Sequence, residues 1–514
     1  MAAQSYQGAL LFINFDADNL DPLAHRHNIL SHVQKRYQPW KRRERSEALF
    51  ASIKSTRSRI RFATRQDEKA QSRTPFRTSS PITLIAKGNS DPFAVYPIDI
   101  GPEENDLIIL YRDHMIPSLY STELGQKHLK DIASQDWKDA VGALEDTGTA
   151  FGALARYGSI AGKCNPRLKH LAYKYHVKSL ENLRTKISRG HDLQNSTDCM
   201  HVSMLFAVGT ALGNLSEAIT HGRILLQILQ KQWQERRYDY KLLIYQVVID
   251  FHLSSMFVKR MIFDDGEWLE EISRQVSDAA APYAPVYPRK DWDPCIPDEW
   301  LRASFEAEQQ RFYFIASPPE ITDATSHLGL VFLSHMIQAV LFHSRMIDHY
   351  LKIADQLRNS RLSDAEAEQL VTQQYLALAA AQLRRHVGMT PKIFGVYIYD
   401  SSRLLMALKN ALQAGDVVSR RISSTKYRNA KLWALCIGAL AETAAGSTNK
   451  NPSGHWFNKS LANTAVAMEI CSWDKLQPIL EGFLYYDGPF YIKRPACFED
   501  GHLRSRSPVE LAAK

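Results

Sequence analysis

The stretch from residue 201 to residue 233 reads HVSMLFAVGTALGNLSEAITHGRILLQILQKQW. After Gly213-Asn214, apolar or small residues fall on one face of a helix, at Leu215, Ala218, Ile219, Gly222, Leu226 and Leu229. Asn214 stands three residues before Glu217, which is the spacing of a capping box. We therefore predict two helices, 201–212 and 215–233, joined by a tight turn as an αα-hairpin.

This hairpin has two interpretations. It could be a helix-turn-helix that reads DNA, or a pair of helices packed in a core. Both helices are too apolar to leave a polar face free for recognition. We favour core packing.

Order resumes near residue 91, and helical patterns run from Pro102 to about residue 500, with almost no period-two alternation. Pro102 with Glu103 and Glu104 marks the start of the first long helix. Ser363 and Glu366 repeat the capping-box spacing. Besides the hairpin, the clear helices are 167–188, 240–259, 327–353, 364–386, 402–414 and 427–445. We expect an all-α fold, a large multi-helix domain of antiparallel helix pairs.

The expected organisation has four parts. Residues 1–45 hold an extended apolar piece, ALLFINF at 9–15, followed by a basic helix, and 46–90 read as a disordered basic linker with few large apolar residues. The helical domain occupies 91–500, and 501–514 form a disordered tail. Two loops interrupt the domain: five prolines within 282–297 exclude regular helix, and GSTNKNPSG occupies 446–454.

Composition is that of a soluble globular protein, with 45% apolar and 23% charged residues in 514. Six cysteines stand singly without any C-x-x-C pair, which indicates reduced thiols in the cytosol or nucleus and no zinc site. The N-terminus lacks the features of a signal peptide. Residues 324–344 contain no Asp, Glu, Lys or Arg, but they include three histidines. We read this span as a core helix and expect no membrane association.

Positive charge is concentrated near the N-terminus. Residues 26–77 carry 15 Lys or Arg against four acids, a net charge of +11, whereas the whole chain carries +8. Such a segment predicts a polyanionic partner or a nuclear import signal, and a solvated linker is the alternative. Tyr37 and Trp40 lie among the cations and could pack on bases. The candidates for import or DNA-phosphate contact are Lys35, Arg36, Lys41, Arg42, Arg43, Arg45, Arg57, Arg59 and Arg61.

Two groups of residues could suggest an enzyme. Phe263-Asp264-Asp265-Gly266-Glu267 resembles the aspartate-rich element with which helical prenyl-diphosphate enzymes hold magnesium, but the second element N-D-x-x-S-x-x-x-E is missing. His343, Asp348 and His349 lie close in sequence, but the histidines are six apart, a poor metal spacing. We expect that the chain is not an enzyme and has no cofactor. A helical magnesium-dependent enzyme stays a remote alternative.

Several short motifs resemble one family in their order. They are FINFDADNLDPLAHRHNILSHVQKRYQPWKRRER at 12–45, Ser90-Asp91-Pro92-Phe93, Gly213-Asn214 with Ala218 and His221-Gly222, Leu432-Trp433 with Gly438-Ala439-Leu440, Trp456-Phe457, Ser472-Trp473 and Leu480-Glu481-Gly482-Phe483-Leu484-Tyr485. Together they resemble the fungal-specific transcription factor domain found in zinc binuclear cluster regulators. The resemblance runs from about residue 12 to 485.

This resemblance implies an all-helical regulatory domain that acts in the nucleus of a fungus, in control of a metabolic or secondary-metabolite gene cluster. It also implies other transcription factors, DNA, and a second copy of the chain as partners. The six-cysteine zinc cluster of that family has no counterpart here. Three explanations stay open: a DNA-binding partner, DNA contact through the basic segment, or a missing upstream exon. A co-regulator or scaffold that does not bind DNA is the alternative function.

Overall fold

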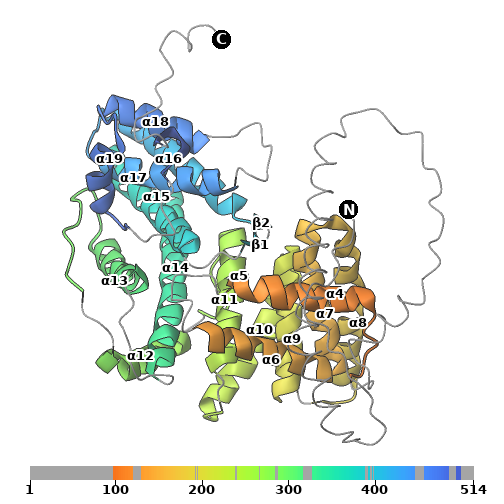
Figure 1. Cartoon of the computed structure of the whole chain (residues 1–514). Helices are drawn as coiled ribbons and strands as arrows, with labels where there is room; N and C mark the ends of the chain where they lie inside the picture. Colours follow the sequence, from red (N-terminus) through yellow and green to blue (C-terminus); the bar gives the residue numbers. More distant parts are fainter. Residues whose placement is uncertain are drawn as a thin grey trace, which may run out of the picture.

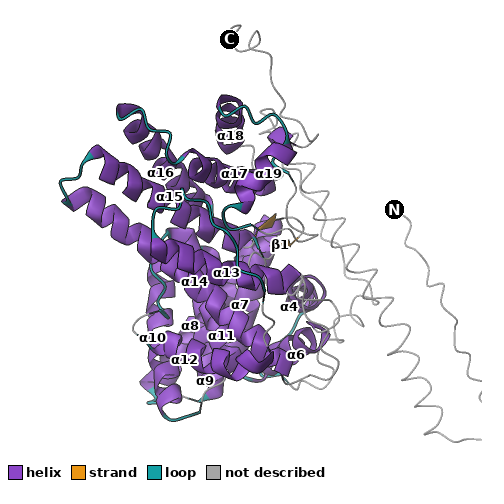
Figure 2. Ribbon diagram, turned by 90° about the vertical axis from the view of Figure 1, so that its left-hand side faces the viewer, coloured by secondary structure: helices purple, strands orange, loops and turns teal. Residues whose placement is uncertain are grey.

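The computed structural model describes residues 96–119, 129–191, 193, 195–237, 240–264, 267–283, 287–316, 327–387, 392–393, 396–397, 399–445, 456–485 and 494–498. The extended piece, basic helix and linker predicted within 1–90, the loop at 446–454 and the tail at 501–514 lie outside these residues. The described chain is helical apart from short loops and one strand pair, which confirms the all-α prediction (Figure 2).

The first helices gather on one side of the molecule (Figure 1). α4 (Pro102–Leu110) continues through a π-helical turn (Tyr111–Met115) into α5 (Ile116–Leu119). The rest of this group is α6 (Leu129–Gly142), α7 (Thr147–Cys164), α8 (Lys169–Ser188), α9 (Ser196–Leu212), α10 (Leu215–Gln234) and α11 (Tyr240–Phe257). One core lies among α4, α7, α8 and α9, with Leu107, Leu154 and Leu171 buried in it.

The remaining helices run from the lower end of the molecule to its upper end (Figure 1). They are α12 (Trp268–Ala280), α13 (Glu299–Ala316), α14 (His327–Asn359), α15 (Asp364–His386), α16 (Ser402–Arg421), α17 (Arg428–Ala445), α18 (Trp456–Ala467) and α19 (Trp473–Glu481). Two-residue strands β1 (Lys392–Ile393) and β2 (Val396–Tyr397) pair antiparallel between α15 and α16. The long helix α14 contacts α11, α12 and α15, so it joins the two groups.

The αα-hairpin is present as α9 and α10, and nearly every residue of α9 from Asp198 to Ala211 is buried. Core packing is therefore its role. Gly213 ends α9 with φ +75°, a left-handed conformation that favours glycine. Asn214 accepts a hydrogen bond from the Glu217 backbone N–H at 3.4 Å, but the Asn214 N–H donates to Gly209 O. The capping box is thus half formed here, whereas both of its hydrogen bonds are present between Ser363 and Glu366.

Several helices extend beyond their predicted limits. The helix predicted over 201–212 begins at Ser196, because the side chain of Asn195 accepts a hydrogen bond from the Asp198 N–H at 2.7 Å. The helices predicted over 327–353 and 402–414 continue to Asn359 and Arg421. The loop predicted at 282–297 is present from residue 287 to α13, whereas Pro282 lies in a 3₁₀ turn (Ala281–Tyr283) that follows α12. None of the helices in the described ranges is long and apolar enough to cross a membrane.

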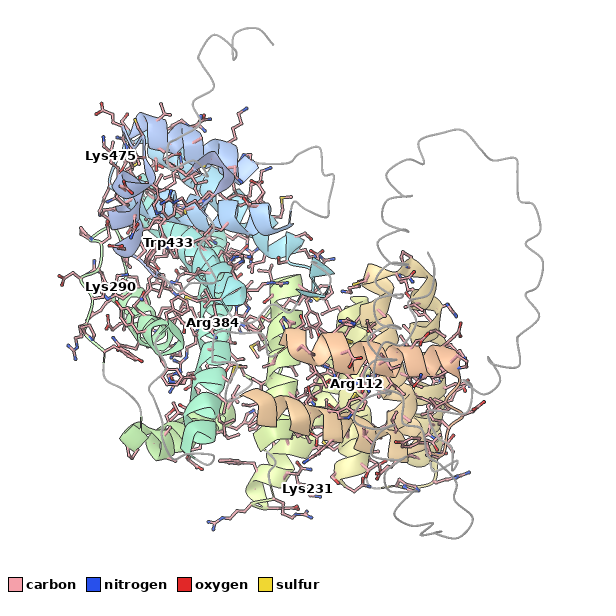
Figure 3. All side chains as sticks on the ribbon, in the orientation of Figure 1. Arg112, Lys231, Lys290, Arg384, Trp433 and Lys475 are labelled. Atoms are coloured by element: carbon pink, nitrogen blue, oxygen red, sulfur yellow. The ribbon has the colours of Figure 1, made fainter. Side chains whose placement is uncertain are left out.

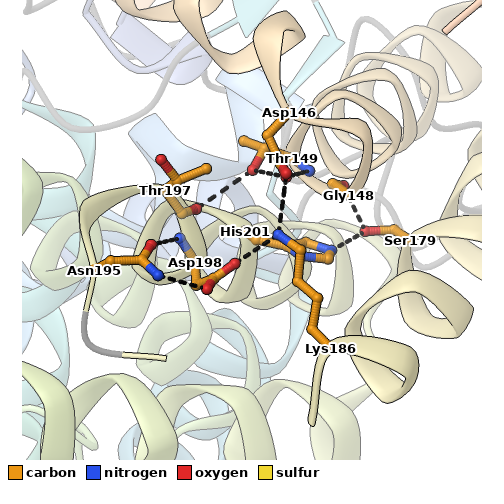
Figure 4. A network of polar contacts seen from close by, with 9 residues as sticks. All are labelled: Asp146, Gly148, Thr149, Ser179, Lys186, Asn195, Thr197, Asp198 and His201. Atoms are coloured by element: carbon orange, nitrogen blue, oxygen red, sulfur yellow. Dashed lines mark hydrogen bonds and ion pairs between the residues drawn. The ribbon is translucent and has the colours of Figure 1, made fainter. Parts of the chain in front are cut away.

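Three helix ends meet at Lys186, which lies in the last turn of α8 (Figure 4). Its Nζ lies 3.1 Å from both carboxylate oxygens of Asp146 and 2.5 Å from Oδ1 of Asp198. Asp146 caps α7 by accepting from the Thr149 N–H at 2.9 Å, and Asp198 lies in the first turn of α9. The ammonium group therefore stabilises two carboxylates, and each carboxylate in turn stabilises the N-terminus of a helix.

Candidate functional site

A cleft of about 920 Å³ opens between α10, α11, α13 and α14. This volume lies in the range of small-molecule binding sites. One wall is apolar and includes the buried side chains of Leu226, Leu253 and Met261. The polar lining residues other than Trp300 come from α10, α11, the loop between α11 and α12, α12 and α14. They are Arg223, Ser254, Lys259, Arg260, Asp264, Glu270, Ser344, Arg345, Asp348, His349 and Lys352.

Positive charge exceeds negative charge around this cleft, with five Lys or Arg against three Asp or Glu. Asp348 pairs with Arg260 and with Lys352, each at 2.6 Å. Glu270 pairs with Arg345 at 2.9 Å. Among the described ion pairs, Arg223 and Lys259 have no acidic partner. The cleft therefore favours acidic over basic ligands.

The mouth of the cleft has an aromatic wall. The ring of Trp300, 41% exposed, stacks on His349 with centroids 4.6 Å apart. Burial lowers the pKa of His349 below its ordinary value, so the imidazole is neutral at pH 7. A neutral stacked pair of this kind offers a flat surface to a planar group.

The aspartate-rich segment contributes one residue to the cleft, Asp264. Burial raises the pKa of its carboxyl above the ordinary value, although a hydrogen bond with Ser344 opposes this change. A carboxyl that resists ionisation is a poor ligand for a hard cation. Asp265 and Gly266 lie outside the described residues. Within the described ranges, no group of three or more His, Cys, Asp or Glu could hold a metal ion.

The structure separates the three residues at 343–349 that the sequence places close together. His343 is buried in the core, with its ring 4.3 Å from that of Phe251 and its Nε2 3.1 Å from Ser255 Oγ. Asp348 and His349 instead line the cleft. His343 is therefore a core residue, and the described residues of this group form no site that could hold a metal ion.

One buried carboxyl group supports the wall of the cleft from behind. Asp250, 1% exposed, accepts a hydrogen bond from the Phe263 N–H at 2.8 Å and so fixes the loop that carries Met261 and Ile262. Its Oδ1 is buried and has no hydrogen-bond partner among the described atoms. Burial raises the pKa of Asp250 to about 8, despite the opposing hydrogen bonds from Phe263 and Ile262. The carboxyl is therefore mainly protonated at pH 7.

Asp250→Asn should stabilise the protein increasingly as pH rises. In the native state Asp250 keeps its proton up to a pKa of about 8, whereas in the unfolded state it ionises near pH 4. Stability is therefore lost between these two pH values, because the unfolded state binds fewer protons. Asparagine removes this loss and retains an acceptor for the Phe263 N–H. We expect the gain in the free energy of unfolding to grow by up to about 1.4 kcal/mol for each pH unit from pH 5 to pH 8, measured by urea denaturation.

The control for this prediction is Asp278→Asn on α12, where the side chain is exposed. This substitution should leave the pH dependence of the free energy of unfolding as in the wild type. Equal stability of Asp250→Asn and the wild type at pH 8 would contradict the assignment of a protonated carboxyl.

The basic candidates lie elsewhere. Lys35, Arg36, Lys41, Arg42, Arg43, Arg45, Arg57, Arg59 and Arg61 are outside the described residues. Of the cleft residues, only Asp264, Asp348 and His349 were singled out in the sequence as candidates for chemistry. Arg223, Lys259, Trp300 and Arg345 carry no local signal, because the cleft joins segments far apart in the chain.

No family model, curated protein or solved structure matches the chain.

Proposed function

We propose that this chain is a nuclear regulator of transcription in a fungus, which controls a metabolic or secondary-metabolite gene cluster through its helical domain. The supporting observation is the packing of motif residues that resemble the fungal-specific transcription factor domain. Trp433 stacks on Phe483 with centroids 5.5 Å apart, and its Nε1 donates to Leu484 O at 2.9 Å. A Cβ on Gly438 would overlap the ring of Phe457. Figure 3 labels Trp433 inside this core.

These motifs are separated by up to about 50 positions, yet their residues contact one another in a single core. Residues that must fit together in this way are expected to form the signature of a domain. The motif residues of the hairpin are also closely packed. His221 lies 3.6 Å from the carboxylate of Glu217, and a Cβ on Gly222 would lie 2.7 Å from Ile262. The resemblance thus involves residues that the fold requires.

DNA contact is the second part of the proposal. All six cysteines are free thiols in the structure, and those within the described ranges form no metal-holding group. Contact with DNA would therefore come from the basic segment, from a partner protein, or from a segment encoded upstream of residue 1. Phosphate contacts by Lys and Arg give affinity without sequence specificity. A co-regulator or scaffold that does not touch DNA is the alternative, and the same free cysteines support it.

The test is chromatin occupancy of a tagged chain, compared with a variant in which Lys41, Arg42, Arg43 and Arg45 are changed to Gln. We expect discrete occupancy for the wild type and loss of nuclear signal and occupancy for the variant. An independent import signal fused to the variant separates the two roles of the segment. Restored occupancy would assign these residues to import, and nuclear retention without occupancy would assign them to DNA contact.

Two results would contradict the proposal. The first is a wild-type chain that stays in the cytosol. The second is a chain that enters the nucleus but shows no discrete occupancy, and whose gene can be deleted without a change in transcript levels. That result would favour the scaffold alternative.

A further inference from the structure

A second cavity, of about 750 Å³, lies between α12, α13 and α14. Its walls include Trp268 and Ser277 from α12, Arg311 from α13, and Gln338 and Phe342 from α14. Arg345 and Glu270 line both this cavity and the first cleft, so their ion pair lies between the two. The second cavity differs from the first because one of its cations is buried: Arg311 is 7% exposed.

Arg311 belongs to a buried cluster in which the charges do not balance. Glu308 is fully buried, and its carboxylate accepts from Arg311 Nε at 2.6 Å and from Arg384 NH1 at 3.1 Å. Arg384 is 3% exposed, and Figure 3 places it beside α14. Two guanidinium groups thus share one carboxylate. The remaining positive charge is removed from water, which is unfavourable unless an anion or strong dipoles compensate it.

Other hydrogen-bonding groups lie on the same walls, beside the carboxylates of Glu267, Glu270, Glu271 and Asp278. Gln338 Oε1 accepts from Arg311 NH1 at 3.1 Å, and Gln338 Nε2 donates to Ser277 Oγ at 2.6 Å. The indole Nε1 of Trp268 is buried and has no hydrogen-bond partner among the described atoms. A buried N–H without an acceptor is rare in folded proteins, so this N–H is a candidate donor to a bound ligand.

We infer that this cavity binds a small monocarboxylate, whose single negative charge balances the second guanidinium of the Glu308, Arg311 and Arg384 cluster. The carboxylate accepts hydrogen bonds from the guanidinium of Arg311 and from the indole of Trp268. The apolar side chains of Leu341 and Phe342 contact the body of the ligand. Glu267, Glu271 and Asp278 also line the cavity, and their charges disfavour ligands that carry several negative charges.

Isothermal titration of the purified full-length chain with benzoate and 2-naphthoate tests this inference, with benzamide, 2-naphthamide and citrate as matched comparisons. We expect both acids to bind in the range of about 10 µM to 1 mM, and the amides and citrate to bind at least about tenfold more weakly. Arg311→Met should weaken acid binding by at least about tenfold, because it removes the charge-assisted hydrogen bonds.

Arg358→Met is the control, because Arg358 lies on α14 outside the lining of this cavity, is exposed and is paired with Asp355. It should leave binding unchanged. Trp268→Phe keeps the aromatic shape without the N–H donor, and we expect it to weaken binding about three- to tenfold. This second variant keeps the test valid if Arg311→Met does not fold.

Three results would overturn the inference: no heat of binding with either acid at about 10 mM, equal affinity for acids and amides, or wild-type affinity in folded Arg311→Met. The experiment uses neither DNA nor cells. A negative binding result would therefore say nothing against the proposed role in transcription. Evidence against that role would likewise leave the binding result unchanged.

Discussion

Replacing Glu308 by Gln should lower the free energy of unfolding by about 3–5 kcal/mol. The carboxylate is fully buried and is the only described acidic partner of the guanidinium groups of Arg311 and Arg384. Glutamine keeps the shape of the side chain but removes the charge, so two positive charges stay buried without compensation. Breaking a buried ion pair in this way is strongly destabilising, since the charge left behind cannot be solvated.

The charge imbalance in this cluster gives the experiment an internal comparison. Arg311→Met leaves one arginine and one carboxylate, which is a balanced pair, so it should destabilise less than Glu308→Gln even though it also removes a buried group. Urea denaturation, monitored by circular dichroism, measures the free energy of unfolding of both variants. The control is Glu235→Gln, which breaks the exposed ion pair between Glu235 and Arg237 and should be as stable as the wild type. A larger loss for Arg311→Met than for Glu308→Gln would contradict the excess of positive charge.

Lys186→Met should lower the free energy of unfolding by about 2–4 kcal/mol. The ammonium is 15% exposed and pairs with Asp146 and Asp198, whose side chains are 26% and 4% exposed. Methionine fills the same space but leaves two carboxylates close together at the N-termini of α7 and α9. The folded state is destabilised because the two carboxylates repel each other and lose their hydrogen bonds to the ammonium group. Urea denaturation at pH 7 measures the loss.

The pH dependence distinguishes this electrostatic role from simple packing. Burial raises the pKa of Asp146, but hydrogen bonds from Thr149 and Lys186 outweigh it, so the pKa lies below the ordinary value. A lowered folded-state pKa gives stability that is present above the unfolded pKa of about 4 and is lost as pH falls through the folded pKa. The difference in the free energy of unfolding between Lys186→Met and the wild type should therefore become smaller as pH falls below about 4.

Two further variants complete the comparison. Asp198→Asn in the Lys186→Met background should restore part of the stability, because it removes one of the repelling charges. Arg184→Met, at an exposed position on the same helix, should change little. A loss for Lys186→Met that stays constant from pH 7 to about pH 3 would indicate packing alone.

The sequence determined the helical class and many helix limits. Periodicity and capping act over three or four residues, so they are visible locally. α10 begins after Asn214 and α15 after Ser363, as their cap spacings predict. The distinction between a core hairpin and a DNA-reading one also followed from composition, because a helix as apolar as α9 can only be buried.

Only the tertiary structure decided α7 and the two cavities. α7 includes four glycines, which have low helix propensity, and the sequence did not mark it as a clear helix. Its glycines allow close approach to α8: a Cβ on Gly158 would lie 2.8 Å from the backbone N of Ala172. Packing between helices thus overrides local preference.

The charge balance of the buried cluster is likewise a tertiary property. Glu308 and Arg384 are 76 residues apart, and nothing near either of them in the sequence signals the other. Asp348 and His349 drew attention as a local group, yet their place in a cleft depends on Trp300 and Arg260 from other segments. Local rules fix how each segment folds, whereas burial of charge and the shape of a cavity depend on contacts that exist only after the segments have packed.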